Sequence, residues 1–276
     1  MSYVEVTVQV LDEWKDIVQA ELHELGYSGI WDKGSELSAY IEQDAFNHKA
    51  VYDTLAGHGM ENHFSYQILE DQNWNAVWEA NFDPVEIDDR VIVRSPFHTE
   101  APSFQHEIII QPQMSFGTGH HETTRLVIMA MLGLNFMDKS VLDMGTGTGV
   151  LAVLAHRLGA RHVVGIDNDL NSVENAQENL KYNTGVDVVY LHGSSDVIPD
   201  QSYDIVLSNI TKNINVKLLP ELVKRVCTGG TLVMAGFLNF DLDEVNQLVV
   251  SHNMQLERNI SLGDWECLVY TKNSET

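Results

Sequence analysis

The chain has 276 residues, 44% of them apolar, and its 40 acidic side chains against 16 lysines and arginines give a net charge of −24. The length predicts two domains, and the apolar fraction suffices for hydrophobic cores rather than a disordered chain. The charge argues against nucleic acid or an anionic membrane as a direct partner, because both would repel the protein; it permits a basic partner, although it can equally serve solubility alone.

Cysteine content and hydrophobic patterning favour a cytoplasmic protein without membrane contact. The only cysteines are Cys227 and Cys267, which imply no disulfide framework. The N-terminus lacks the basic and then apolar pattern of a secretory signal. The longest uncharged apolar stretch, Leu126 to Met137, is shorter than the ~20 residues that span a bilayer.

Residues 1–70 predict a small α+β domain. Alternation of apolar and polar residues predicts strands over 3–10, 28–32, 36–42 and 62–69. Helical spacing predicts one helix over 11–25, stopped by Gly26, and another from an Asp44 cap to about residue 56, ended by Gly57. The order β-α-β-β-α-β is that of ferredoxin-like domains.

Residues 71–95 are expected to form a linker with a short helix over 71–80. Trp74 and Trp78 lie four positions apart there, and we expect them to pack against a domain edge rather than bind a ligand. Strand-like runs follow at 91–93 and 107–110.

Residues 96–276 predict an α/β domain with a seven-stranded, doubly wound, Rossmann-like sheet. Strands are expected at 140–144, 162–167, 186–192, 203–209 and 230–236, with helices between them. Residues 254–272 predict two antiparallel strands around Gly263 and Asp264, which give the sheet an antiparallel edge.

A glycine-rich turn after the first of these strands is the strongest signal of a ligand site. The run from Val141 to Gly149 reads V-L-D-M-G-T-G-T-G, with Asp143 before Gly145 and Gly147. It departs from the dinucleotide pattern G-x-G-x-x-G, and Asp143 would repel a pyrophosphate but suits a cationic ligand. The turn resembles the first motif of methyltransferases that bind S-adenosylmethionine.

Two further strand ends carry candidate site residues. Asp167 follows the glycine turn by about 20 residues, a spacing that places a carboxylate on the ribose hydroxyls. The alternative for Asp167 is a helix cap, a role that Asn168 or Asp169 could fill. Asn209 ends the strand over 203–209, where many amino-group methyltransferases hold the target nitrogen; the alternative is a turn-forming asparagine.

The segment 116–124, F-G-T-G-H-H-E-T-T, precedes the predicted sheet. Its His120, His121 and Glu122 could suggest a metal, but adjacent residues rarely converge on one ion, so we expect no metal site. We expect the loop that starts at Phe116 to fold over a cofactor, and Thr123 or Thr124 to cap the following helix.

Together these features resemble the ribosomal protein L11 methyltransferases over nearly the whole chain, and F-G-T-G-x-H-x-T-T is the most specific element. The resemblance implies S-adenosylmethionine as cofactor, bound by Thr124, Gly145, Asp167 and Asn209. Asp143, Gly147, Phe116 and Thr123 are further candidates for this site. The chain has Glu122 where the family usually has proline. The first turn of a helix tolerates glutamate, because its negative charge is favourable there.

The resemblance also implies methyl transfer to amines of ribosomal protein L11, namely lysine side chains, with the N-terminal α-amine as a second candidate. Asn209 would be the catalytic residue, and residues 1–70 would recognise the substrate. We expect a monomer without direct contact to nucleic acid. The alternatives are a methyltransferase acting on nucleic acid, on another protein or on a small-molecule amine, and a non-enzymatic module that binds the cofactor.

Overall fold

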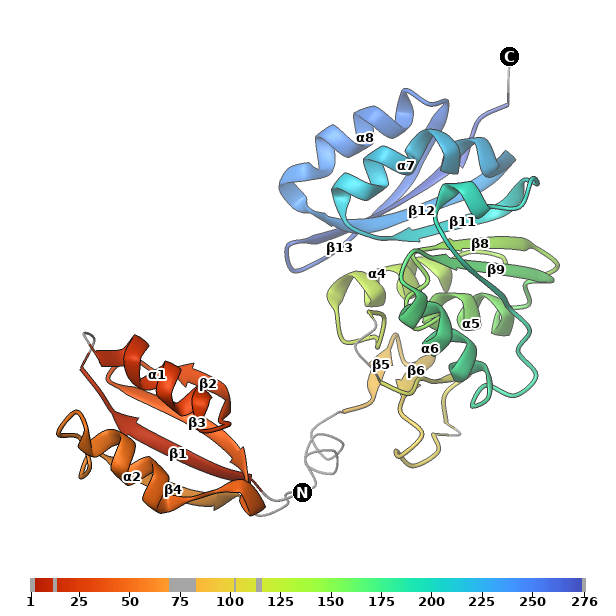
Figure 1. The fold of residues 1–276 in the computed structure, drawn as a ribbon. Coiled ribbons are helices and arrows are strands. Elements are labelled where there is room, and N and C mark those ends of the chain that lie inside the picture. Colours follow the sequence, from red (N-terminus) through yellow and green to blue (C-terminus); the bar gives the residue numbers. More distant parts are fainter. Residues whose placement is uncertain (1–2, 12–13, 70–82, 102, 113–115, 275–276) are drawn as a thin grey trace. The chain divides into compact units, whose positions relative to one another are not determined.

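The computed structural model describes residues 3–11, 14–69, 83–101, 103–112 and 116–274. The chain divides into two compact units, Met1–Phe82 and Asp83–Thr276 (Figure 1). Residues 83–95, expected as part of a linker, therefore fall in the second unit. The expected helix over 71–80, with Trp74 and Trp78, lies outside the described residues.

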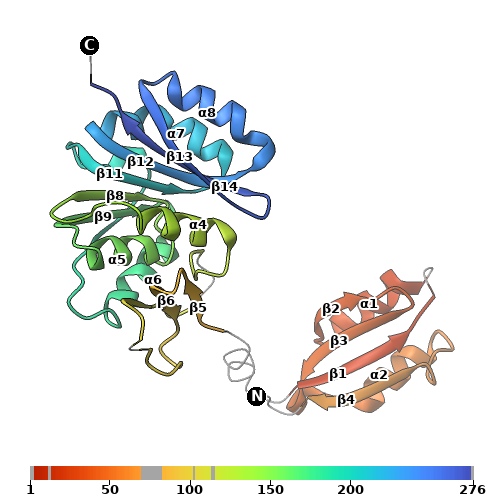
Figure 2. The ribbon, with the colours of Figure 1, turned by 180° about the vertical axis from the view of Figure 1, so that it is seen from behind.

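The first unit is a four-stranded antiparallel sheet in the order β2-β3-β1-β4, with two helices packed on one face (Figures 1 and 2). Its core joins valines of alternate positions in β1, such as Val4 and Val6, to apolar side chains of both helices. This order confirms the predicted ferredoxin-like arrangement. The elements are β1 (Tyr3–Gln9), α1 (Lys15–Glu24), β2 (Ser28–Asp32), β3 (Glu36–Glu42), α2 (His48–Ala56) and β4 (Phe64–Leu69).

The helix ends of this unit test the predicted caps. Gly26 follows α1 with φ of 90°, and Gly57 is the C-cap of α2, as expected. The expected N-cap at Asp44 is wrong. Residues 43–45 form a short 3₁₀ turn, and the side chain of Asn47 caps α2 by accepting a hydrogen bond of 3.1 Å from the Ala50 amide.

The second unit begins with a small sheet in which β5 (Val85–Ile87) pairs antiparallel with β6 (Val91–Arg94), and β6 pairs parallel with β7 (His106–Ile109). The two later strands lie where strand-like runs were expected, whereas β5 was not predicted. Apolar side chains of all three strands join the same core as α4 (Glu122–Met131) and α5 (Val150–Arg157).

The main sheet has seven strands in the order β10-β9-β8-β11-β12-β14-β13, which confirms the Rossmann-like prediction. The first five of these run parallel, and β14 runs antiparallel to both of its neighbours. The antiparallel strand therefore lies one position inside the edge. The strands are β8 (Ser140–Met144), β9 (His162–Asp167), β10 (Val189–His192), β11 (Tyr203–Asn209), β12 (Val226–Leu238), β13 (Met254–Leu262) and β14 (Trp265–Lys272).

Helices cover both faces of this sheet (Figures 1 and 2). One core contains side chains of α4, α5 and α6 (Leu170–Leu180), and the other contains those of α7 (Lys212–Arg225) and α8 (Leu242–Val250). With both faces buried, the central strands are apolar on both sides. The carboxyl ends of β8, β9 and β11 meet along one edge of the sheet, where such folds bind ligands.

The described part of the chain contains neither a membrane-spanning helix nor a cluster of metal ligands. None of its helices combines the length and apolarity needed to cross a membrane. Its histidine, cysteine, aspartate and glutamate side chains form no group of three that could hold a metal ion.

Candidate functional site

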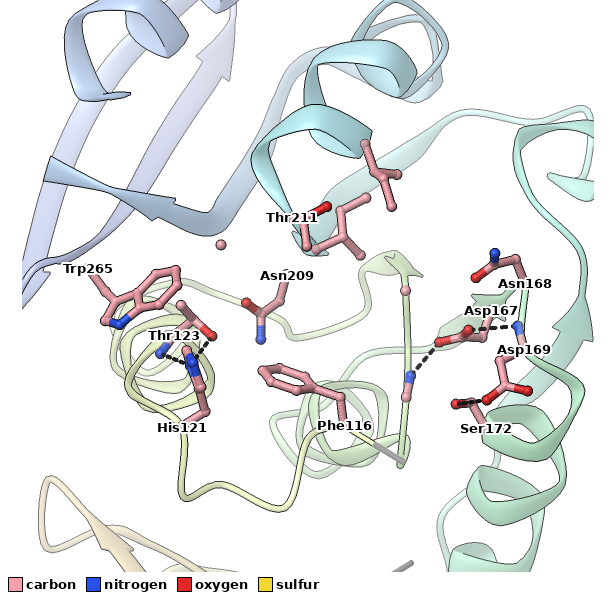
Figure 3. Close-up of a pocket in the computed structure, with 15 residues that line it drawn as sticks. Phe116, His121, Thr123, Asp167, Asn168, Asp169, Ser172, Asn209, Thr211 and Trp265 are labelled. Atoms are coloured by element: carbon pink, nitrogen blue, oxygen red, sulfur yellow. Dashed lines mark hydrogen bonds between the residues drawn. The ribbon is translucent and has the colours of Figure 1, made fainter. Parts of the chain in front are cut away.

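A cavity of about 490 Å³ opens at the carboxyl ends of β8, β9 and β11 (Figure 3). This volume lies within the usual range for small-molecule sites. Its lining draws on the glycine turn, the loop before α4, the ends of β9 and β11, the start of α7 and the first residue of β14.

The glycine turn between β8 and α5 forms the floor of the cavity. Gly145 and Gly147 both have positive φ, 78° and 54°, and both line the cavity. A Cβ on Gly145 would collide with Ile210, and one on Gly147 would collide with the carbonyl oxygen of Phe116. Glycine at these positions thus permits both the backbone conformation and the close packing of neighbouring segments.

The loop that precedes α4 is tied to this turn. Thr148 donates two hydrogen bonds to it, from its amide to the Phe116 carbonyl at 2.9 Å and from Oγ1 to the Gly117 carbonyl at 2.7 Å. The ring of Phe116 borders the cavity and remains half exposed. These two hydrogen bonds hold the loop beside the glycine turn.

Asp167 connects the glycine turn to the start of α6. Its Oδ2 accepts a hydrogen bond of 2.9 Å from the Gly147 amide, and its Oδ1 accepts one of 3.0 Å from the Asp169 amide. Asp169, not Asp167, is the N-cap of α6 and accepts from the Asn171 amide at 3.1 Å. This favours the ligand role over the cap role for Asp167, because its carboxylate borders the cavity and each oxygen retains acceptor capacity.

Asp143 is fully buried at the end of β8 and lies outside the lining of the cavity. Its Oδ2 accepts a hydrogen bond of 2.6 Å from Oγ1 of Thr146, within the glycine turn. Burial raises the pKa of Asp143 to about 7, the Thr146 hydroxyl opposes this shift, and the charge of Asp167 adds to it. Asp143 therefore stabilises the glycine turn through its hydrogen bond with Thr146.

Asn209 ends β11 with its side chain at the cavity, 8% exposed. Its Nδ2 donates a hydrogen bond of 3.3 Å to Oγ1 of Thr124, which is buried behind the lining. Among the described residues, Oδ1 of Asn209 is buried without a hydrogen-bond partner. Buried polar atoms are rarely left unpaired, so this oxygen points to a ligand that donates a hydrogen.

The helix after the loop is capped by His121 and not, as expected, by Thr123 or Thr124. Nδ1 of His121 accepts a hydrogen bond of 3.2 Å from the Thr123 amide and lies 2.9 Å from the Thr123 hydroxyl. The cap lies two or three residues earlier than expected because α4 already begins at Glu122. The imidazole thereby becomes part of the wall of the cavity.

The comparisons with known proteins agree over the length of the chain. The family model described as ribosomal protein L11 methyltransferase (PrmA) matches residues 2–273. A ribosomal protein L11 methyltransferase of Porphyromonas gingivalis is 36% identical, over 94% of this chain and 91% of the relative. One of Bacteroides fragilis is 32% identical, over 98% of this chain and 99% of the relative.

This chain belongs to the ribosomal protein L11 methyltransferase family. Among solved structures, it is similar to the ribosomal protein L11 methylase from Lactobacillus delbrueckii subsp. bulgaricus, with a TM-score of 0.66 and 25% identity over 70% of this chain and all of that one. A methyltransferase from Pyrococcus furiosus shares the fold, with a TM-score of 0.52 and 16% identity, over 60% of this chain and 90% of that one. The protein is therefore a methyltransferase.

The predicted site residues of this methyltransferase fall into two layers. The cavity is lined by Phe116, Thr123, Gly145, Gly147, Asp167 and Asn209, whereas Asp143 and Thr124 lie behind it. Trp265 also lines the cavity and was not predicted. Nothing in its local sequence marks it, because it reaches the site only through the pairing of β14 with β12.

Proposed function

We propose that this protein transfers methyl groups from S-adenosylmethionine to amines of ribosomal protein L11, namely lysine side chains and the N-terminal α-amine. Membership of the family and the names of its relatives support the substrate. The observation that carries the amine chemistry is Asn209, which lines the cavity and whose buried Oδ1 lacks a hydrogen-bond donor within the described residues.

The residues of the cavity fit the proposed cofactor. Gly145 and Gly147 line the cavity without side chains, so a ligand can lie against their backbone. Asp167 offers carboxylate oxygens to a ribose diol, as strand-end acids do in related folds. Asp143 adds a carboxylate below the turn, which suits a ligand carrying positive charge. When bound, S-adenosylmethionine supplies a methyl group activated by the attached sulfonium.

The methyl acceptor must be a neutral amine, because an ammonium ion has no lone pair. At pH 7 a lysine of pKa ~10.4 must lose a proton at a free-energy cost of about 4.6 kcal/mol, whereas an α-amine near ~7.8 needs about 1 kcal/mol. Oδ1 of Asn209 can accept one N–H of the amine and so direct the lone pair toward the methyl group. Asn209 is itself held by Thr124.

The first unit is proposed to capture the protein substrate. Acidic side chains outnumber basic ones throughout residues 1–70, and the whole chain carries a charge of −24. Such a field attracts a basic ribosomal protein and speeds its association, and it repels nucleic acid. Added salt should therefore slow capture of the substrate and leave the turnover of bound substrate little changed.

Purified protein, S-adenosylmethionine and ribosomal protein L11 provide the direct test. We expect the intact mass of L11 to rise by methyl increments, and fragmentation to place them on lysines or on the α-amine. Parallel reactions with separated ribosomal proteins, RNA and amine metabolites test the other substrate classes. Methylation of one of those classes, with L11 left unmodified, would contradict the proposal.

Deletion of residues 1–82 tests the role of the first unit. We expect the truncated protein to bind S-adenosylmethionine as the full chain does, because the cavity belongs to the second unit. Its kcat/KM for intact L11 should fall at least tenfold. Full activity of the truncated protein on intact L11 would refute capture by the first unit.

A further inference from the structure

The two ends of the cavity differ in chemistry. Figure 3 shows Asp167, Asn168, Asp169 and Ser172 at one end, and Asn209 with the aromatic rings at the other. Both carboxylates of the described lining belong to the first end. The chain as a whole carries a net charge of −24. By contrast, the described lining residues at the second end of the cavity include no acidic side chain.

Three aromatic rings form a continuous wall at the Asn209 end. The ring centroids of Phe116 and His121 are 5.2 Å apart, and those of His121 and Trp265 are 4.8 Å apart with an edge-on interplanar angle of 69°. The rings come from the loop before α4, the cap of α4 and the first residue of β14. Figure 3 shows the Asn209 amide facing the space that they border.

The wall is held rigidly at its centre. His121 is fixed by the hydrogen bond that its Nδ1 accepts from the Thr123 amide, so the imidazole cannot turn without loss of the helix cap. Trp265 is half-buried and packs its indole on the edge of this fixed imidazole. The indole therefore has a defined position relative to Asn209.

We infer that this wall of Phe116, His121 and Trp265 is the subsite for the amino group of the substrate, and that Trp265 is its amine-contacting residue. The inference rests on the proposed amine methylation. Apolar ring surfaces exclude water from the amine and so favour its neutral, reactive form, whereas a carboxylate at the same place would stabilise the unreactive ammonium.

The wall also suits the charge that forms during transfer. The amine nitrogen bonds to the methyl carbon with its lone pair while the electron pair of the breaking carbon–sulfur bond stays on sulfur, and the new ammonium later gives one proton to water. Positive charge thus appears on nitrogen beside the aromatic faces. A cation next to an indole face gains about 0.5–2 kcal/mol, which stabilises the transition state more than the neutral amine.

Substitution of Trp265 tests the inference. Trp265→Leu keeps an apolar side chain without the aromatic face, and Trp265→Phe restores an aromatic ring. We expect Trp265→Leu to lower kcat/KM for L11 about tenfold and Trp265→Phe to recover most of it, because a cation–π contact of ~1.4 kcal/mol corresponds to a factor of ten. The dissociation constant for S-adenosylmethionine, measured by calorimetry, should change less than twofold in both.

Phe240→Leu is the matched control, since Phe240 is 76% exposed and lies outside the lining.

A second pair of variants tests the lack of a carboxylate. Thr211 is exposed, lines the cavity and lies two residues after Asn209. Thr211→Glu places an acid there and Thr211→Gln an amide of the same size. We expect Thr211→Glu to methylate L11 about tenfold more slowly than Thr211→Gln at pH 7, without weaker binding of S-adenosylmethionine.

The outcomes separate this inference from the proposed function. If the wild-type protein methylates L11, three results would each overturn the amine subsite. These are a wild-type kcat/KM in Trp265→Leu, a parallel loss of S-adenosylmethionine affinity in that variant, and equal rates in the Thr211 pair. A wild-type protein that leaves L11 unmodified would overturn the proposed function, and the subsite with it.

Discussion

Asn209 at the end of β11 and Thr124 in the first turn of α4 are joined by a hydrogen bond of 3.3 Å across 85 positions of the chain. The amide of Asn209 donates it through Nδ2, and the Thr124 hydroxyl accepts. The Oδ1 of the same amide is buried without a partner among the described residues. The hydrogen bond to Thr124 thus holds the amide by its nitrogen and leaves the oxygen as the unpaired atom.

Asn209→Ala should abolish methyl transfer, with kcat at least about 100-fold lower, because loss of one well-placed polar group in an active site has effects of this size. S-adenosylmethionine affinity should be retained in part. Thr124→Val should lower kcat about tenfold by freeing the amide, and Thr124→Ser, which keeps the hydroxyl, is its control. Unchanged turnover in Asn209→Ala would remove Asn209 from the mechanism and leave it a turn-forming residue.

Asp167→Asn should weaken binding of S-adenosylmethionine by about 10- to 100-fold, the effect of losing charge-assisted hydrogen bonds worth about 1.5–3 kcal/mol. S-adenosylhomocysteine should lose affinity equally, because the two molecules share the ribose. Calorimetry on both ligands measures this. A loss confined to S-adenosylmethionine would contradict a ribose role and point to the methyl-bearing end instead.

The site residues that could be predicted from the sequence follow strands or glycines. Gly145, Asp167 and Asn209 come directly after apolar runs, and parallel strands bring their carboxyl ends to one edge, so local patterns sufficed to bring them together. A doubly wound sheet with helices on both faces could be predicted for the same reason. Helix caps and helix boundaries were predicted less well, because several polar residues compete for one helix end. For example, Asn47 and not Asp44 is the N-cap of α2.

Trp265 shows what the sequence could not provide. Its place at the cavity depends on the pairing of β14 with β12, in which Trp265 lies opposite Leu238 and not only within its own hairpin. A tryptophan after Gly263 and Asp264 reads locally as the start of a hairpin strand and nothing more. The two layers formed by Asn209 and Thr124 were likewise hidden, because a motif gives residue types without the direction of each side chain.

Gly147→Ala should disrupt the floor of the cavity. The residue has φ of 54°, and its Cβ would collide with the Phe116 carbonyl, which itself accepts the Thr148 amide. We expect the free energy of unfolding to fall by about 2–4 kcal/mol, from left-handed strain of about 1–2 kcal/mol plus the displaced loop. Binding of S-adenosylmethionine should weaken at least tenfold.

Gly185→Ala is the matched control for this substitution. Gly185 also has positive φ, 77°, but a Cβ there meets nothing within 4 Å. It should therefore lose only about 1–2 kcal/mol of stability and keep full ligand affinity. Equal effects of the two substitutions on ligand binding would show that the contact with Phe116 has no role in shaping the cavity.

Asp143 should make both stability and cofactor binding depend on pH near neutrality. Burial raises its pKa from 3.8 to about 7 in the folded protein, so between these values the native state binds a proton that the unfolded chain has lost. The contribution of Asp143 to the free energy of unfolding is then present below pH ~4 and falls as pH rises toward ~7. Asp143→Asn should remove this fall, which chemical unfolding at about pH 5 and about pH 8 measures.

Binding of the cofactor reverses the preference of the same carboxyl. A bound ligand that carries positive charge favours the ionised form of Asp143, so its pKa should fall and a proton should be released on binding. Affinity for S-adenosylmethionine should consequently rise as pH increases through ~7, and calorimetry in buffers of different ionisation enthalpy should detect the released proton. In Asp143→Asn, whose amide oxygen can still accept the Thr146 hydroxyl, both the pH dependence and the proton release should vanish. Persistence of either in the variant would assign the titration to another group.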